Sequence, residues 1–166
     1  MAETITRILV PVDFSVHSDR AVRYAMELAG KVGARVELLH VVENPVVSGA
    51  WSSEIYVANL PELLESLMAD ANRRLEMVKT ATAREGIEVG TCVVSGTPAH
   101  MILDEARTGR FDLIVMGTHG RTGLSHVLMG SVAERVVRRA FCPVLTLRAA
   151  PPVSEATSAK AAHAAV

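Results

Sequence analysis

The 166-residue sequence is poor in cysteine and carries almost no net charge. Two cysteines, Cys92 and Cys142, are too few for a disulfide framework, and no CxxC or Cys/His cluster indicates a zinc site. A balance of 17 basic and 18 acidic residues gives a formal net charge of −1. No global field therefore favours nucleic acid or an anionic membrane surface as a partner.

Long apolar runs and targeting signals are also missing. No run reaches the length that spans a bilayer, and the N-terminal stretch MAETITRILV lacks the charged-then-apolar pattern of a secretory signal. We therefore expect a cytoplasmic protein without a membrane partner. Hydrophobic residues make up 49% of the chain, which at this length predicts one globular domain with a real core.

Several signatures of nucleotide enzymes are absent. There is no GxxxxGK[ST] loop and no HRD-type catalytic loop, which argues against a dedicated phosphotransferase. The dinucleotide fingerprint belongs directly after the first strand, where the stretch from Pro11 to Ser15 contains no glycine. The His-x-Gly-His and Ser-Gly-Gly signatures of adenylyl-transferring proteins are missing too.

Apolar periodicity and cap residues predict five strands alternating with four helices. The strands are expected at 5–12, 35–42, 87–94, 111–116 and 144–147. The helices are expected to begin at Ser15 or Ser18, Pro61, Pro98 and Ser131, and to end at Gly33, Gly86, Gly109 and before Pro143. Ser131 and Glu134 fit a capping box. The stretch from Glu43 to Leu60 has no clear periodicity and predicts a surface excursion, with a ligand-ordered lid as the alternative.

This alternation predicts an α/β domain over residues 1–148 with a doubly wound, five-stranded parallel sheet of order 3-2-1-4-5 and helices on both faces. Strands 1 and 4 are then neighbours whose crossovers leave in opposite directions, and ligands bind beyond the carboxyl ends at such a point. Cys92 and Cys142 fall at opposite sheet edges, so no intrachain disulfide is expected. Residues 149–166, rich in Ala, Pro and Ser, predict a disordered tail.

The main functional signal is the stretch GTHGRTGLSHVLMGS at 117–131, which follows the fourth predicted strand. Gly117, Gly120 and Gly130 are separated by two and then nine residues, and the stretch contains no carboxylate. Glycines let a backbone approach a ligand closely, and the helix that follows offers free N–H groups and the positive end of its dipole. The loop therefore predicts phosphate binding. His119 and His126 are interpreted as exposed loop residues rather than metal ligands.

With these motifs in view, the chain resembles the universal stress protein family, ATP-binding type. The resemblance covers nearly everything from Ile8 to Arg148. It rests on VPVDFS at 10–15, HVV at 40–42, GTP at 96–98, DLIVMG at 112–117, Gly-x2-Gly-x9-Gly-Ser at 117–131 and PVL at 143–145. Similarity to this family implies binding of an adenosine nucleotide, with ATP, alone or with Mg²⁺, as the cofactor. It also implies a homodimer formed through the fifth strand, at Val144, Leu145 and Leu147.

The resemblance carries over to individual positions. On the adenine and ribose side it implies Pro11, Val12, Asp13 and Val41. On the phosphate side it implies Gly117, Gly120, Gly130, Ser131 and Val132, with Met116 and Arg121 alongside. Two of these residues keep a second interpretation, because Asp13 also suits a cap of the first helix and the Ser131 hydroxyl also suits a cap of the last.

Three functions remain open at this level. The favoured one is a nucleotide-binding sensor or regulator of the stress response that acts as a homodimer. The second is a weak ATPase or an autophosphorylating protein. The third is a dimeric adaptor without a ligand, in which the glycine loop is only a connector.

Overall fold

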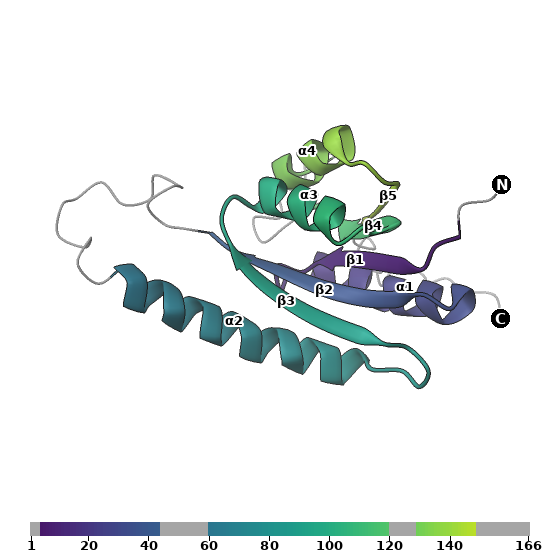
Figure 1. Cartoon of the computed structure of the whole chain (residues 1–166), viewed down its shortest axis with the longest axis horizontal. Coiled ribbons are helices and arrows are strands. Elements are labelled where there is room, and N and C mark those ends of the chain that lie inside the picture. Colours follow the sequence, from purple (N-terminus) through teal and green to yellow (C-terminus); the bar gives the residue numbers. More distant parts are fainter. Residues whose placement is uncertain (1–3, 44–59, 120–128, 149–166) are drawn as a thin grey trace, which may run out of the picture.

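The computed structural model describes residues 4–43, 60–119 and 129–148. Within these ranges five strands alternate with four helices along the chain, and neighbouring strands are all parallel. The elements are β1 (Arg7–Pro11), α1 (Val16–Val32), β2 (Arg35–Val42), α2 (Leu60–Thr82), β3 (Val89–Ser95), α3 (Pro98–Thr108), β4 (Leu113–Gly117), α4 (Ser131–Arg139) and β5 (Val144–Leu147). The strand order is 3-2-1-4-5, which confirms the predicted α/β sheet (Figure 1).

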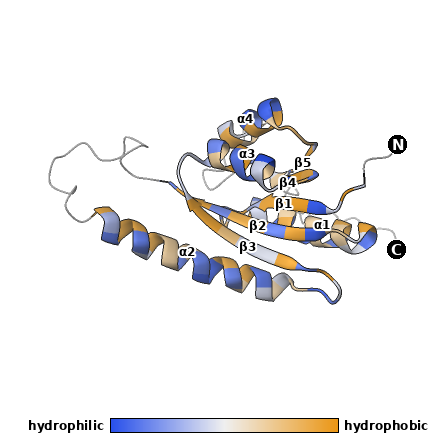
Figure 2. Ribbon diagram, viewed as in Figure 1, coloured by the Kyte–Doolittle hydropathy of each residue, from blue (hydrophilic) through white to orange (hydrophobic). Residues whose placement is uncertain are grey.

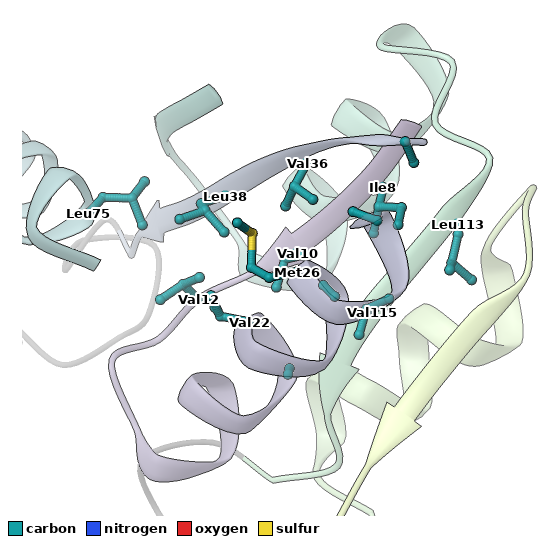
Figure 3. Close-up of a cluster of buried hydrophobic side chains, with 14 residues drawn as sticks. Ile8, Val10, Val12, Val22, Met26, Val36, Leu38, Leu75, Leu113 and Val115 are labelled. Carbon is teal, nitrogen blue, oxygen red and sulfur yellow. The ribbon is translucent and has the colours of Figure 1, made fainter. Parts of the chain in front are cut away.

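Helices cover both faces of the sheet, α1 and α2 on one and α3 and α4 on the other (Figure 1). Successive side chains of β1 point to opposite faces of the sheet, so they pack into two different hydrophobic cores. Ile8 and Val10 pack with Met26 of α1 (Figure 3), whereas Leu9 packs with Ile102 of α3. Each helix carries hydrophilic and hydrophobic residues along its length (Figure 2), as expected where only one side meets the sheet.

The first helix begins and ends as its sequence predicts. Ser15 is its N-cap, and the Ser15 hydroxyl accepts a hydrogen bond from the Ser18 N–H at 3.3 Å. Gly33 is its C-cap with φ 72°, a left-handed conformation that glycine adopts without strain.

β1, β3 and β4 each begin two residues later than predicted, and two predicted helix boundaries are wrong. Helix α2 ends at Thr82, where the hydroxyl donates back to the Val78 carbonyl at 2.7 Å. Gly86, with φ 79°, lies four residues further on, in the connection to β3. The N-cap of α4 is Gly130 rather than Ser131, so the predicted capping box is absent. The reason is tertiary, because the Gly130 N–H is bonded to the carbonyl of Thr118 at 2.7 Å.

The remaining sequence predictions concern the two cysteines, two irregular segments and membrane spans. Cys92 lies in β3 and Cys142 lies two residues before β5, and β3 and β5 are the two edge strands of the sheet. The predicted excursion between Glu43 and Leu60 and the predicted tail at 149–166 lie outside the described residues. Among the helices in the described ranges, none combines the length and the apolar character needed to cross a bilayer.

Candidate functional site

A cavity of about 540 Å³ opens where the carboxyl ends of β1 and β4 separate. The chain leaves β1 toward α1 on one face and leaves β4 toward α4 on the other, so this is the point where the sheet reverses its winding direction. The walls come from the ends of β1, β2 and β4 and from the N-terminal halves of α1, α3 and α4.

Most of the predicted binding residues meet in this cavity. Those that line it are Pro11, Val12, Asp13, Val41, Met116, Gly117, Gly130, Ser131 and Val132. The remaining two, Gly120 and Arg121, lie outside the described residues. Sequence reasoning missed further wall residues, namely Ser18, Leu39, His40, Glu43, Pro98, Ile102, Thr118, His119 and Ala133. The sequence pointed to two of them, because Thr118 and His119 fall inside the glycine loop.

The main chain of Val41 is open to the cavity on one side. In β2, odd residues bond toward β1, as when the Leu39 carbonyl accepts from the Val12 N–H at 2.8 Å, and even residues bond toward β3. β1 ends at Pro11, the partner of Leu39, whereas β2 continues to Val42. Within the described residues, no hydrogen bond reaches the Val41 N–H or C=O. A donor and an acceptor therefore lie side by side at the cavity wall.

Asp13 has one carboxylate oxygen engaged and one available. Its Oδ1 accepts from the Ser15 hydroxyl at 2.6 Å and from the Ser15 N–H at 3.1 Å. No hydrogen bond within the described ranges reaches Oδ2. Asp13 is not the helix cap, because Ser15 holds that position and Asp13 orients Ser15 from two residues earlier. The interpretation of Asp13 as a direct cap of the first helix is therefore wrong.

The Phe14 ring packs against His40 just after the carboxyl end of β1. Phe14 has φ 63°, a left-handed conformation that is strained for a bulky side chain. Its ring lies 4.5 Å from the imidazole of His40 between centroids, and the Arg74 guanidinium lies 4.0 Å from the Phe14 centroid. His40 in turn donates from Nδ1 to the Val12 carbonyl at 2.7 Å. His40 thus ties the end of β2 to the residue that follows β1.

The N-terminus of α4 supplies hydrogen-bond donors to the opposite wall. The first intrahelical bond runs from the Glu134 N–H to the Gly130 carbonyl at 2.9 Å. The N–H groups of Ser131, Val132 and Ala133 precede that bond and have no partner in the described part of the chain. Three residues that line the cavity thus carry orphan donors at the positive end of a helix.

Both described glycines of the loop lie where a side chain would be in tight contact with neighbouring atoms. A Cβ on Gly130 would lie 3.3 Å from the Thr118 carbonyl oxygen and 3.7 Å from the Cα of His119. A Cβ on Gly117 would lie 3.0 Å from the Cβ of His17 and 3.1 Å from its main-chain carbon. Gly117 therefore lets α1 pack directly against the end of β4, and Gly130 lets α4 begin beside the same strand.

His119 belongs to the wall of the cavity rather than to an exposed loop tip. It is half-buried, and its ring lies 5.6 Å from that of His17 between centroids. Its Nδ1 lies 2.9 Å from the hydroxyl oxygen of Thr118. Among the described residues, no three His, Cys, Asp or Glu side chains gather in a way that would hold a metal ion.

The fold agrees with comparisons to known proteins. The profile of the Universal stress protein family matches residues 4–148. The chain belongs to the universal stress protein family. The universal stress protein MJ0531 of Methanocaldococcus jannaschii is 36% identical over 148 residues, which cover 86% of this chain and 81% of that protein.

Solved structures of other members have the same fold. The structure of MJ0577, also from Methanocaldococcus jannaschii, superposes with a TM-score of 0.78 at 28% identity, covering 89% of this chain and 99% of that one. A universal stress protein in complex with cAMP superposes with a TM-score of 0.57 at 25% identity, covering 88% of this universal stress protein and 98% of the other.

Proposed function

We infer that this universal stress protein binds an adenosine nucleotide, ATP, in the cavity between β1 and β4. It would act as a nucleotide sensor or regulator in the stress response rather than as a dedicated catalyst. The observation that carries the inference is the unpaired main chain of Val41, facing three orphan N–H groups of α4 across one cavity.

The Val41 main chain suits adenine better than other purines. Adenine offers an acceptor at N1 beside a donor at its 6-amino group, so it complements one N–H and one C=O of the protein. Hypoxanthine and guanine reverse both roles, with an N–H at N1 and a carbonyl at C6. A reversed base would leave the two main-chain groups unpaired and buried, which costs about 1 to 3 kcal/mol for each.

The rest of a nucleotide fits the remaining walls. The available Oδ2 of Asp13 can accept from ribose hydroxyls. The N–H groups of Ser131, Val132 and Ala133 can donate to phosphate oxygens, with the α4 dipole adding attraction. The N–H of Gly130 is already bonded to Thr118, so Gly130 contributes by having no side chain rather than by donating.

Comparison with a relative supports the same ligand class. The family member in complex with cAMP binds a nucleotide built from adenine, ribose and phosphate. The described residues gather no set of three metal-ligating side chains, so a Mg²⁺ ion would be held mainly by the phosphates of ATP.

Calorimetry with ATP and inosine triphosphate tests this function directly. The two nucleotides share ribose and triphosphate and differ in the donor–acceptor order of the base. We expect ATP to bind roughly 100-fold more tightly, as two mismatched hydrogen bonds imply. Equal affinities would rule out base reading by Val41, and the absence of binding by either nucleotide would overturn the function.

Phosphate release from the same complexes separates a sensor from an enzyme. A sensor keeps ATP bound and intact, and denaturing freshly purified protein would release that nucleotide for identification. Steady release of phosphate above the buffer rate would instead favour the weak ATPase.

The homodimer is proposed through β5, which is an edge strand of the sheet. Odd residues of β5 bond to β4, as when the Leu147 carbonyl accepts from the Thr118 N–H, so the N–H of Thr146 faces outward. Val144, Leu145 and Leu147 are only partly buried, and Phe141 beside them is 72% exposed. Bare edges of this kind pair readily.

Substituting Thr146 with proline removes the outward N–H and leaves the bonds to β4 in place. We expect Thr146→Pro to be monomeric by light scattering and Thr146→Ala to remain dimeric. A wild type that is monomeric at micromolar concentration would overturn the dimer without affecting nucleotide binding.

A further inference from the structure

The β1–β2 ladder stops at a defined hydrogen bond. Its last rung joins the Val12 N–H to the Leu39 carbonyl at 2.8 Å. In a parallel ladder the next rung would run from the Val41 N–H to the Val12 carbonyl. That rung is absent, although β2 continues through Val42 with its other side paired to β3.

The missing rung is replaced by a side-chain hydrogen bond. His40 Nδ1 lies 2.7 Å from the Val12 carbonyl oxygen, and because a carbonyl only accepts, Nδ1 carries the hydrogen. The Val12 carbonyl thus receives its bond from the imidazole and not from the Val41 main chain. As a result, the amide that faces the cavity stays unpaired.

The imidazole is held in this position by packing against Phe14. The Phe14 ring lies 4.5 Å from the His40 ring between centroids, at an interplanar angle of 37°. The Arg74 guanidinium of α2 lies 4.0 Å from the Phe14 centroid, within cation–π range. Phe14 accepts a strained, left-handed backbone at this position, with φ 63°. The contact between the two rings keeps His40 beside Val12.

We propose that His40 is a positioning residue for base recognition: by bonding the Val12 carbonyl, it ends the β1–β2 ladder and keeps the Val41 N–H available for a purine. The proposal rests on the proposed function for its ligand. It extends that function by naming the residue that keeps the Val41 main chain available to the base. His40 does not itself touch the base through this bond.

Two substitutions of His40 separate the hydrogen bond from the bulk of the side chain. The side-chain amide of asparagine can place its NH₂ group close to the position of Nδ1, so His40→Asn preserves a donor to Val12. Leucine preserves an apolar side chain for packing and removes the donor. A matched control is His100→Gln on the exposed surface of α3.

Amide hydrogen exchange of the nucleotide-free protein gives the first readout. In wild type and in His40→Asn the Val41 amide should exchange rapidly, because it has no partner. In His40→Leu the freed Val12 carbonyl accepts that amide, and its exchange should slow at least tenfold. An unchanged exchange rate in a folded His40→Leu variant would overturn the proposal whether or not the protein binds nucleotide.

Base selectivity gives the second readout. The ratio of ATP to inosine triphosphate affinity should fall about tenfold in His40→Leu, the equivalent of one main-chain hydrogen bond, and recover in His40→Asn. A merely structural role would weaken both nucleotides equally and leave the ratio unchanged, which would overturn the proposal while the nucleotide function stands. If wild type binds neither nucleotide, the function itself fails, and the exchange experiment still decides what His40 does.

Discussion

Main-chain N–H groups lie at both ends of the β1–β4 pair. At the amino end they donate to a carboxylate of the chain, whereas at the carboxyl end they have no partner among the described residues. At the amino end, Asp112 Oδ2 accepts from the Thr6 N–H at 2.8 Å, the Thr6 hydroxyl at 2.7 Å and the Arg7 N–H at 2.9 Å. At the carboxyl end, the N–H groups of Ser131, Val132 and Ala133 have no partner among the described residues.

The two ends differ in whether the chain itself supplies the hydrogen-bond acceptor. At one end the chain supplies its own anion, and the carboxylate of Asp112 joins β4 to the start of β1. At the other end the donors line one wall of a cavity, and under the proposed function the anion is part of the nucleotide. The first arrangement adds stability, whereas the second leaves polar groups unpaired at the proposed binding site, which lowers stability. Three substitutions test this contrast.

The largest effect is expected at Gly117, where α1 packs against the end of β4. In Gly117→Ala the added Cβ would lie 3.0 Å from the His17 side chain and 3.1 Å from its main chain. Overpacking against backbone should lower the free energy of unfolding by about 2 kcal/mol. Urea denaturation measures the change, with the slope of the transition checked for two-state behaviour.

Gly30→Ala is the matched control, because its added Cβ meets only the Ile87 side chain at 3.5 Å within a helix. There the same substitution should raise the free energy of unfolding by about 0.5 to 1 kcal/mol, from helix propensity. If Gly117→Ala also proved neutral or stabilising, the close approach of α1 to β4 would not constrain the site.

A medium effect is expected when the cavity is given an anion of its own. Ser131→Asp places a carboxylate at the first residue of α4, beside the orphan N–H groups. Repulsion of phosphate should weaken ATP about tenfold, and the helix dipole should raise the free energy of unfolding by roughly 0.5 kcal/mol. Calorimetry and thermal melting measure the two changes.

Ser131→Asn, which matches the shape without the charge, should keep most of the ATP affinity. Equal ATP binding by the Asp and Asn variants would mean that the α4 N-terminus does not hold the phosphates. The proposed orientation of the nucleotide would then be wrong, even if ATP binds elsewhere in the cavity.

The smallest effect is expected at the amino end. Asp112→Asn exchanges a carboxylate for a neutral amide, and because the site is partly exposed to solvent the loss should be only about 1 kcal/mol in the free energy of unfolding. ATP affinity should not change, since the cavity lies at the other end of the strands.

The contribution of Asp112 should also depend on pH. Hydrogen bonds from the Thr6 side chain and main chain, followed by that from the Arg7 N–H, hold the pKa of the carboxyl below its ordinary value of 3.8. A lowered folded-state pKa means that the contribution is complete above the unfolded value and is lost as pH falls through the folded value. Wild type and Asp112→Asn should therefore differ in stability at pH 7 and converge below pH 3.8.

Local sequence signals decide most of the scaffold. Alternating apolar residues and helix caps act over a few neighbours along the chain, so the succession of strands and helices and the Gly33 stop follow from the sequence alone. The strand order follows from that succession together with the right-handedness of crossovers, and the structure selects Ser15 over Ser18 as the cap. The glycine spacing likewise identified the wall of the cavity formed by Gly117, Gly130 and Ser131. Boundaries that depend on distant partners were missed, as at the start of α4, where Thr118 binds Gly130.

By itself, the sequence determined that this universal stress protein is a doubly wound α/β sheet with a crevice between its first and fourth strands. Only the tertiary structure decided which polar groups in that crevice are paired. The bond from His40 to Val12 spans 28 positions of sequence and the bond from Asp112 to Thr6 spans 106. No local pattern encodes contacts of that range, because they exist only once the strands are aligned in register.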